Sequence, residues 1–97
     1  MPLIRWANVS ANGSIYAASE GISITRIGDG QYAISFSPPF SKVPAIVGTQ
    51  TGYGTINERT TDNVVFPFVS EANATALTGD DKGIHVDRGF SIIAIGD

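Results

Sequence analysis

The chain has 97 residues, of which 15% are charged, and its formal net charge at pH 7 is −3. This length corresponds to one domain, residues 1–97, and the six Lys and Arg residues, scattered singly, argue against a nucleic-acid partner. Because there is no cysteine, disulfides and thiolate metal sites are excluded. No apolar run approaches the roughly 18 residues of a membrane helix, and the N-terminus lacks the layout of a secretory signal peptide, so no membrane insertion is expected.

Short runs of alternating apolar and polar residues, separated by glycine and proline, predict strands throughout the chain. Asn12-Gly13 and Asp29-Gly30 are typical of hairpin turns, because these residues tolerate a positive φ. Strands at such regular spacing favour an all-β fold, a small antiparallel β-sandwich of about six to eight strands. The predicted strands are Leu3–Val9, Ser14–Ala18, Ile22–Ile27, Gln31–Ser37, Pro44–Thr51, Asn63–Ser70, Ala74–Thr78 and Gly89–Gly96.

The stretch Gly30–Gly48 predicts two core strands joined by a proline corner. Tyr32, Ile34 and Phe36 alternate with small residues, which is the pattern of a strand with one buried face. The prolines at positions 38 and 39 end this strand, because proline cannot donate to a ladder. Phe40 is expected to return an aromatic ring to the core before the next strand begins.

Two later strands carry more specific expectations. In Asn63–Ser70 we expect Val64, Phe66 and Phe68 to share one face, and Pro67 indicates an edge position or a bulge. The last strand is apolar on both faces, so it is expected either at the centre of the core or against a neighbouring subunit. A weakly charged small domain often covers part of its surface with copies of itself. The residues expected at such an interface are Trp6, Phe90, Ile92 and Ile93.

Candidate binding residues come from two loops. Tyr53, Asn57 and Arg59 lie in the polar stretch after the fifth predicted strand, where an exposed tyrosine between glycines is typical of a recognition surface; the alternative is that Tyr53 packs onto its own sandwich. Asp80 and Asp81 occupy a glycine-bounded turn, either as acceptors for a sugar or as a solvated hairpin.

His85, the single histidine, is interpreted as a surface or interface residue, and alternation places it on the same face as Asp87. It is also included among the candidate ligand-binding residues. No serine stands in a nucleophile-elbow context and no spacing matches a metal site. We therefore expect no enzymatic activity, no metal and no cofactor.

The pattern GxYxIxFxxPFxxxPxxV over Gly30–Val47 and the closing FSxIAIG at Phe90–Gly96 resemble the H-type lectin domain. That resemblance implies a small antiparallel β-sandwich that forms trimers, some stacked into hexamers, and binds sugars between subunits. The leading part, Ala11–Phe36, looks similar to the knob domains that end bacteriophage tail fibres and bacterial collagen-like proteins. The strand beginning Asn63-Val64-Val65-Phe66 carries no counterpart of the arginine that H-type lectins present there.

The sequence thus predicts a homotrimeric, lectin-like module that binds surface glycans or polysaccharide. The resemblance places it at the receptor-binding tip of a phage tail fibre, and so on a virion, or at a bacterial surface. The alternative is a purely structural trimerisation or assembly domain of a tail fibre or tailspike with no ligand.

Overall fold

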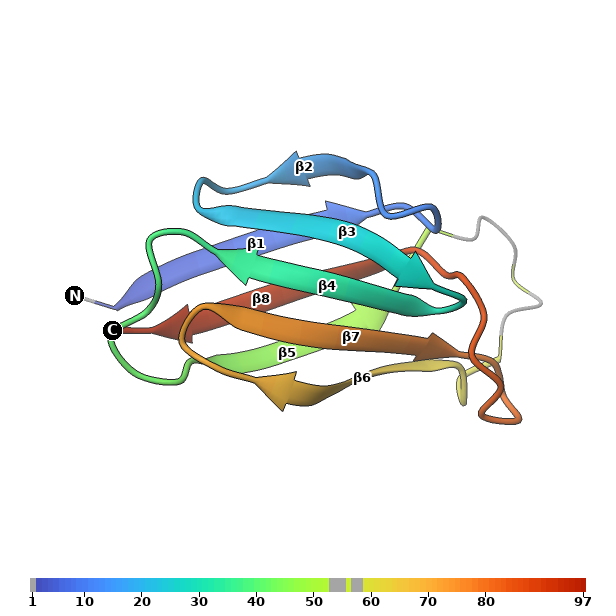
Figure 1. Ribbon diagram of the computed structural model, residues 1–97. Helices are drawn as coiled ribbons and strands as arrows, with labels where there is room; N and C mark the ends of the chain where they lie inside the picture. Colours follow the sequence, from blue (N-terminus) through green and yellow to red (C-terminus); the bar gives the residue numbers. More distant parts are fainter. Residues whose placement is uncertain (1, 53–55, 57–58) are drawn as a thin grey trace.

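The computed structural model describes residues 2–52, 56 and 59–97, and within them it is all-β, with eight strands in two antiparallel sheets (Figure 1). The β1 sheet has the order β2-β1-β8-β5, and the β4 sheet has the order β3-β4-β7-β6. The predicted all-β sandwich is confirmed. The described residues contain no helix that could cross a membrane. The strands are β1 (Leu3–Val9), β2 (Ile15–Ala18), β3 (Ile22–Gly28), β4 (Gln31–Phe36), β5 (Ala45–Gln50), β6 (Asn63–Val69), β7 (Asn73–Gly79) and β8 (Phe90–Gly96).

The observed strand ends differ from the predicted ones by at most one residue. Gly13 and Gly30 have φ of 91° and 63°, as the expected turns require, because only glycine adopts these angles without strain. The turns at one end of the sandwich join β1 to β2 and β3 to β4. At the same end lie the loops that join β5 to β6 and β7 to β8, whereas both termini lie at the opposite end (Figure 1).

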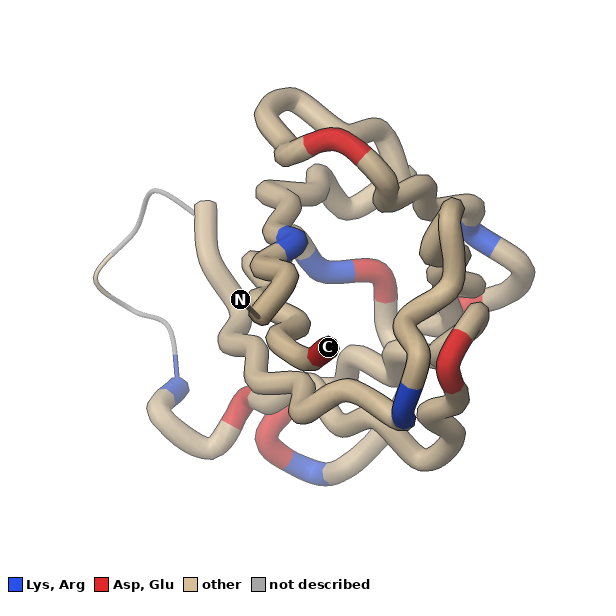
Figure 2. Tube along the Cα trace, turned by 90° about the vertical axis from the view of Figure 1, so that its left-hand side faces the viewer, with Lys and Arg blue, Asp and Glu red and all other residues tan. Residues whose placement is uncertain are grey.

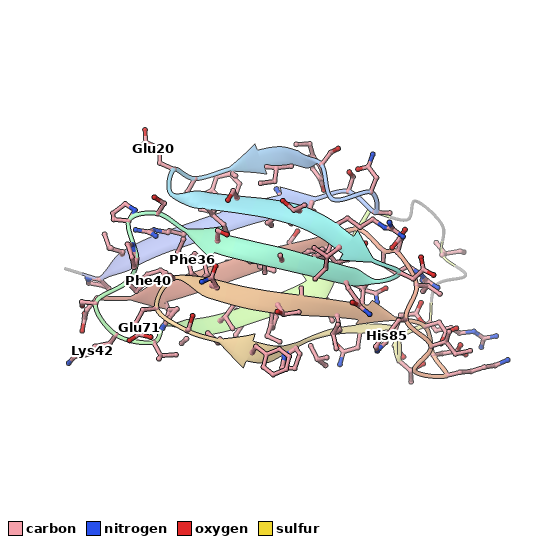
Figure 3. The ribbon with its side chains drawn as sticks, in the orientation of Figure 1. Glu20, Phe36, Phe40, Lys42, Glu71 and His85 are labelled. Atoms are coloured by element: carbon pink, nitrogen blue, oxygen red, sulfur yellow. The ribbon has the colours of Figure 1, made fainter. Side chains whose placement is uncertain are left out.

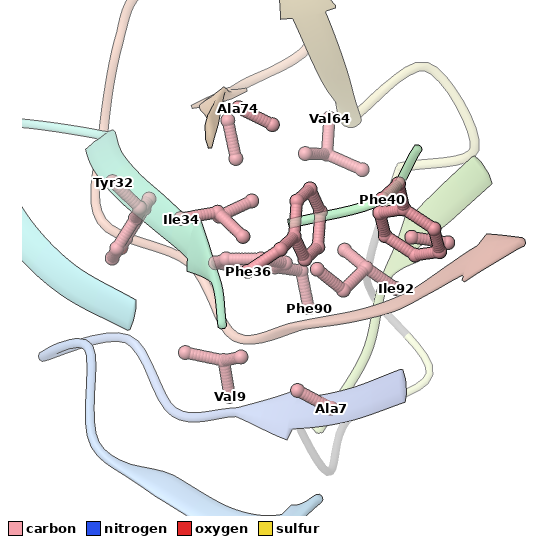
Figure 4. Close-up of a cluster of buried hydrophobic side chains, with 12 residues drawn as sticks. Ala7, Val9, Tyr32, Ile34, Phe36, Phe40, Val64, Ala74, Phe90 and Ile92 are labelled. Carbon is pink, nitrogen blue, oxygen red and sulfur yellow. The ribbon is translucent and has the colours of Figure 1, made fainter. Parts of the chain in front are cut away.

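The core lies between the two sheets and is built on β4, as the sequence predicts. Tyr32, Ile34 and Phe36 are all buried, and Phe40 returns from the proline corner to pack edge-on against Phe36, with ring centroids 5.0 Å apart (Figure 4). The Tyr32 ring contacts Phe90 at 4.9 Å. Such aromatic pairs add to the burial of apolar area that holds the two sheets together.

β8 is central in its sheet, between β1 and β5, and its two faces have different environments. Phe90 and Ile92 are 0% and 1% exposed in the core, which corrects their assignment to a subunit interface, because a single chain already buries them. Trp6 and Ile93 are paired neighbours on the outer face of the same sheet. They are 38% and 48% exposed, so their side chains are open to contact by a second molecule.

β6 is an edge strand that contains a bulge, and Pro67 lies within it. The edge position and the bulge that Pro67 indicated are therefore both confirmed. Val65 pairs with Leu77 and Phe68 pairs with Thr75, so two residues of β6 oppose one of β7. The extra residue inverts the alternation. Phe68 is consequently 70% exposed, and the prediction that it shares the buried face of Val64 is wrong.

Candidate functional site

A hollow of about 210 Å³ opens at the end of the sandwich where β6 begins and β7 ends. It includes three of the predicted binding residues, Asp80, Asp81 and His85, and His85 is marked in Figure 3. Arg59 lies beside it, with its Nε 3.9 Å from Asp81 Oδ2. The described residues that line it are Thr61, Asn63, Val65, Leu77, Thr78, Gly79, Asp80, Asp81, Gly83 and His85.

Two further predicted residues, Tyr53 and Asn57, lie outside the described residues. The structure thus brings together both acidic residues of the β7–β8 turn, the histidine that follows them and the arginine of the preceding loop. This group of four comes from two loops that are separated by β6 and β7.

Asp80 shapes the turn at the rim of the hollow. Its Oδ1 accepts hydrogen bonds from the backbone N–H groups of Lys82, at 2.8 Å, and Ile84, at 3.0 Å. These donors, the Ile84 amide first, lower the pKa of the Asp80 carboxyl, because they favour its charged form. Because Asp80 Oδ1 already accepts two hydrogen bonds from the backbone, the main role of Asp80 is to stabilise the turn.

The side chains of Asp81 and His85 line the hollow and make few contacts with other polar groups of the described residues. Both residues are exposed, and the contact between Asp81 and Arg59 is too long for a hydrogen bond. The backbone of His85 pairs with Gly79 in an isolated bridge, which holds the residue against the end of β7. In the described part of the chain no hydrogen bond joins His85 to Asp87, whose carboxylate binds Arg26 and Gly30 instead.

Seven lining residues were not predicted as binding residues: Thr61, Asn63, Val65, Leu77, Thr78, Gly79 and Gly83. Asn63 Oδ1 accepts from the Val64 amide at 2.8 Å, and its Nδ2 group has no partner among the described residues. Val65 and Leu77 are paired across β6 and β7 and form an apolar wall of the hollow. Of these residues, only Val65 could have been indicated by the sequence, because the alternation in β6 points it away from the core.

Polar contacts between side chains and backbone, and one ion pair, hold this end of the sandwich in place. Gln50 Nε2 donates to the carbonyls of Asn63, at 2.6 Å, and Gly79, at 2.7 Å, and so ties β5 to the opposite sheet. The side chains of Asp62 and Arg88 form an ion pair at 2.9 Å, in which the aspartate is only 8% exposed. The loops that carry Arg59 and Asp81 are therefore each anchored close to the hollow.

Asp87 makes a further set of contacts that hold the β7–β8 loop, on the side next to the β3–β4 turn. Asp87 accepts from the Gly30 amide at 2.8 Å and from Arg26 Nε at 2.8 Å. These two contacts, in that order, lower the pKa of the Asp87 carboxyl. The neighbouring Tyr32 hydroxyl donates to the Ala11 carbonyl at 2.7 Å, and burial raises its pKa.

The hollow combines a carboxylate, an imidazole, an amide and a hydroxyl with an apolar wall. These groups can exchange hydrogen bonds with several hydroxyl groups of one ligand while Val65 and Leu77 contact its C–H groups. Among the described residues no cluster of three or more His, Asp or Glu side chains could hold a metal ion. Comparisons with family models, curated proteins and solved structures found no match to this chain.

Proposed function

We propose that this protein is a non-enzymatic, self-associating module that binds surface glycans through the hollow at the β6–β7 end. The observation that supports it best is the convergence of Asp81, His85 and Asn63 on a small open space beside an apolar wall. A sugar presents hydroxyl groups at its edge and C–H groups on its faces, so this mixture of polar and apolar groups suits it. The setting proposed for such a module is a phage tail fibre or a bacterial surface appendage.

The affinity of one hollow for a sugar is expected to be weak, because the space is small and open. A homotrimer would present three copies of it. Multivalent contact with a glycan-coated surface then raises apparent affinity by roughly 10² to 10⁴ without any new contact. Self-association and glycan binding are in this sense parts of one function.

A glycan array probed with the purified protein tests this proposal. Asp81→Asn and His85→Ala should each weaken binding about tenfold or more, since a hydrogen bond to a charged group contributes roughly 1.5–3 kcal/mol. Glu71→Gln is the matched control, because Glu71 is an exposed carboxylate at the opposite end of the sandwich (Figure 3). Silence of the wild-type protein across the array, or equal binding by both variants, would contradict the proposal.

A second function, a purely structural assembly module, is favoured by the outer surface of the β1 sheet. Trp6 and Ile93 lie side by side there, Val47 pairs with Ile93, and Ile4 pairs with Ile95. All five side chains are large, apolar and substantially exposed. We call this group the apolar face. Exposed apolar patches of this kind mark interaction sites, and the occupant proposed here is a second copy of the chain.

The opposite sheet provides the contrast. The outward positions of β3 and β4 include Ser23, Thr25 and Ser35, which suit contact with water. Within the described strands only Arg5 and Arg26 are charged, and Figure 2 shows the charged positions as short separate segments of the trace. An assembled protein that is silent on the array would favour the structural function over the glycan-binding one.

A further inference from the structure

Arg5 of β1 points into the sandwich at the end opposite the candidate glycan site. The residue is 5% exposed, and its guanidinium lies over the Phe40 ring, 4.6 Å from the centroid. Nη1 donates to the carbonyl oxygens of Gly21 and Pro38, so both of its N–H groups are used. These contacts tie β1 to the β2–β3 turn and to the proline corner.

The charge of Arg5 has no counter-ion among the described residues. The ion pairs found there involve Arg26, Arg59 and Arg88 and no other arginine. Nε and Nη2 of Arg5 have no hydrogen-bond partner among the described residues. Neither is a fully buried atom, because among the described residues the only fully buried side-chain N or O atom without a partner is Asp62 Oδ1. The unused edge of the guanidinium therefore reaches solvent.

That solvent fills a hollow of about 470 Å³, lined by Leu3, Ile4, Arg5, Ser19, Glu20, Gly21, Ser37 and Pro38. Gly21 leaves the space beside the guanidinium open, because a Cβ at this position would lie 3.0 Å from Arg5 Nε and 3.1 Å from Cζ. Its φ of +81° also favours glycine. The hydroxyl of Ser37, on the lining of the same hollow, has no partner among the described residues.

We propose that this hollow, here called the Arg5 hollow, binds a small carboxylate, such as that of a hexuronate. Nε–H and Nη2–H lie on one edge of a planar guanidinium, and such a pair matches the two oxygens of a carboxylate in a bidentate contact. Phe40 and the two carbonyl acceptors already fix the guanidinium plane, so little side-chain freedom is lost on binding. A bound carboxylate would supply the counter-ion that the buried charge lacks.

Glu20 limits the affinity of the Arg5 hollow. It lines the hollow, but its side chain extends away from the sheets in Figure 3. Its negative charge opposes an incoming carboxylate, by at most about 1 kcal/mol, the energy of two unit charges 4 Å apart in water. The Arg5 hollow should therefore prefer a compact carboxylate over a polyanion.

The test is an NMR titration of the full chain with sodium glucuronate, with sodium chloride at equal ionic strength and with glucose as controls. We expect saturable shifts of the Gly21 and Ser37 amides and of the Arg5 Nε–H signal with glucuronate alone. The Asp81→Asn variant should give the same shifts, so a failed glycan proposal leaves this result unaffected. Equal shifts with chloride, or no saturable shift at these groups, would overturn the proposal.

Two variants sharpen the test. Arg5→Lys keeps the charge but loses the bidentate edge, and should weaken glucuronate binding at least tenfold. Glu20→Gln removes the opposing charge and should strengthen it by up to about fivefold, the factor that corresponds to roughly 1 kcal/mol. Since Glu20 is exposed, the second variant is expected to fold even if the first does not. Unchanged affinity in Glu20→Gln would contradict a carboxylate site at this place.

Discussion

At the scale of single residues, two carboxylates of the β7–β8 loop, those of Asp80 and Asp87, bind backbone N–H groups. Asp80 binds two amides of its own turn, and Asp87 binds the Gly30 amide across 57 residues of sequence. Both groups have lowered pKa values. Their charged forms therefore stabilise the loop that carries Asp81 and His85.

Asp87 should make the stability of the fold depend on pH in the acidic range. Because its pKa is lowered in the folded protein, its contribution is present above the unfolded value of about 3.9 and is lost as the pH falls through the folded value. Asp87→Asn should therefore lower the urea midpoint at pH 7, and this difference from wild type should shrink below about pH 4. Asp29→Asn, at an 87% exposed carboxylate that also contacts Arg26, should change the midpoint little. A difference between Asp87→Asn and wild type that stays constant with pH would refute this role.

Gly30 occupies a position where no side chain fits. A Cβ there would lie 2.5 Å from the Thr78 carbonyl oxygen and 2.8 Å from both N and O of Val86, at a φ of +63°. Gly30→Ala should lower the free energy of unfolding by about 2–4 kcal/mol, from the conformational and the steric costs together. Gly83→Ala, at φ +80° with nothing within 4 Å, should lose only the conformational part. Equal losses in urea denaturation would show that the close packing against β7 and Val86 has no energetic weight.

At the scale of elements, the bulge in β6 decides which aromatic rings enter the core. Two residues of β6 oppose one of β7 between Val65 and Phe68. Phe66 consequently packs against the core, whereas Phe68 is exposed on the outer side. An edge strand with a bulge and a proline also resists pairing with other chains.

Alanine substitutions at these two rings measure the effect of the bulge. Phe66→Ala should lower the free energy of unfolding by about 2–3 kcal/mol, below the 3–5 kcal/mol of a fully buried ring because Phe66 is only partly buried. Phe68→Ala should change it by less than about 0.5 kcal/mol, as is usual for an exposed position. The reverse order in urea denaturation would mean that the uninterrupted alternation, with Phe68 in the core, is correct.

At the scale of the whole molecule, both outer surfaces of the sandwich expose large apolar side chains, but within the described residues only the β1 sheet exposes them from three neighbouring strands. The apolar face of the β1 sheet groups large side chains from β1, β5 and β8, whereas Ser and Thr are frequent on the outer positions of β3 and β4. The two hollows lie at opposite ends of the long axis. Self-association through the apolar face would leave the candidate glycan site open to solvent, whereas the Arg5 hollow shares Ile4 with that face.

Light scattering after size exclusion tests this arrangement. We expect the wild-type protein to be a homotrimer at micromolar concentration and Ile93→Asp to be a monomer, because a charge at the centre of the apolar face would be buried without a partner. Phe68→Asp is the matched control, since it places the same charge at an exposed apolar residue of the opposite sheet, and it should leave the oligomer intact. A monomeric wild-type protein would exclude assembly through the apolar face.

Much of the candidate glycan site depends on contacts that alternation and turn residues cannot indicate. The acidic turn at Asp80 and Asp81 and the nearby His85 could be predicted, because they follow one another in the chain. Asn63 and Leu77 join them only through the pairing of Asn63 with Gly79 and of Val65 with Leu77. The Arg5 hollow could not be predicted for the same reason, because β1, the β2–β3 turn and the proline corner meet around the Arg5 guanidinium only in the folded chain.

The sequence by itself determined the strands, their turns and the buried face of β4, since each depends on neighbouring residues: alternation, glycine at positive φ, and proline as a strand end. Only the tertiary structure decided whether some apolar residues face the core or the outer surface of their sheet. Both faces of β8 are apolar, so nothing local distinguishes Ile92, in the core, from Ile93, on the surface. The bulge that turns Phe68 outward and the inward position of Arg5 were settled by strand pairing between distant segments, because the energy of those positions comes from contacts formed only in the folded chain.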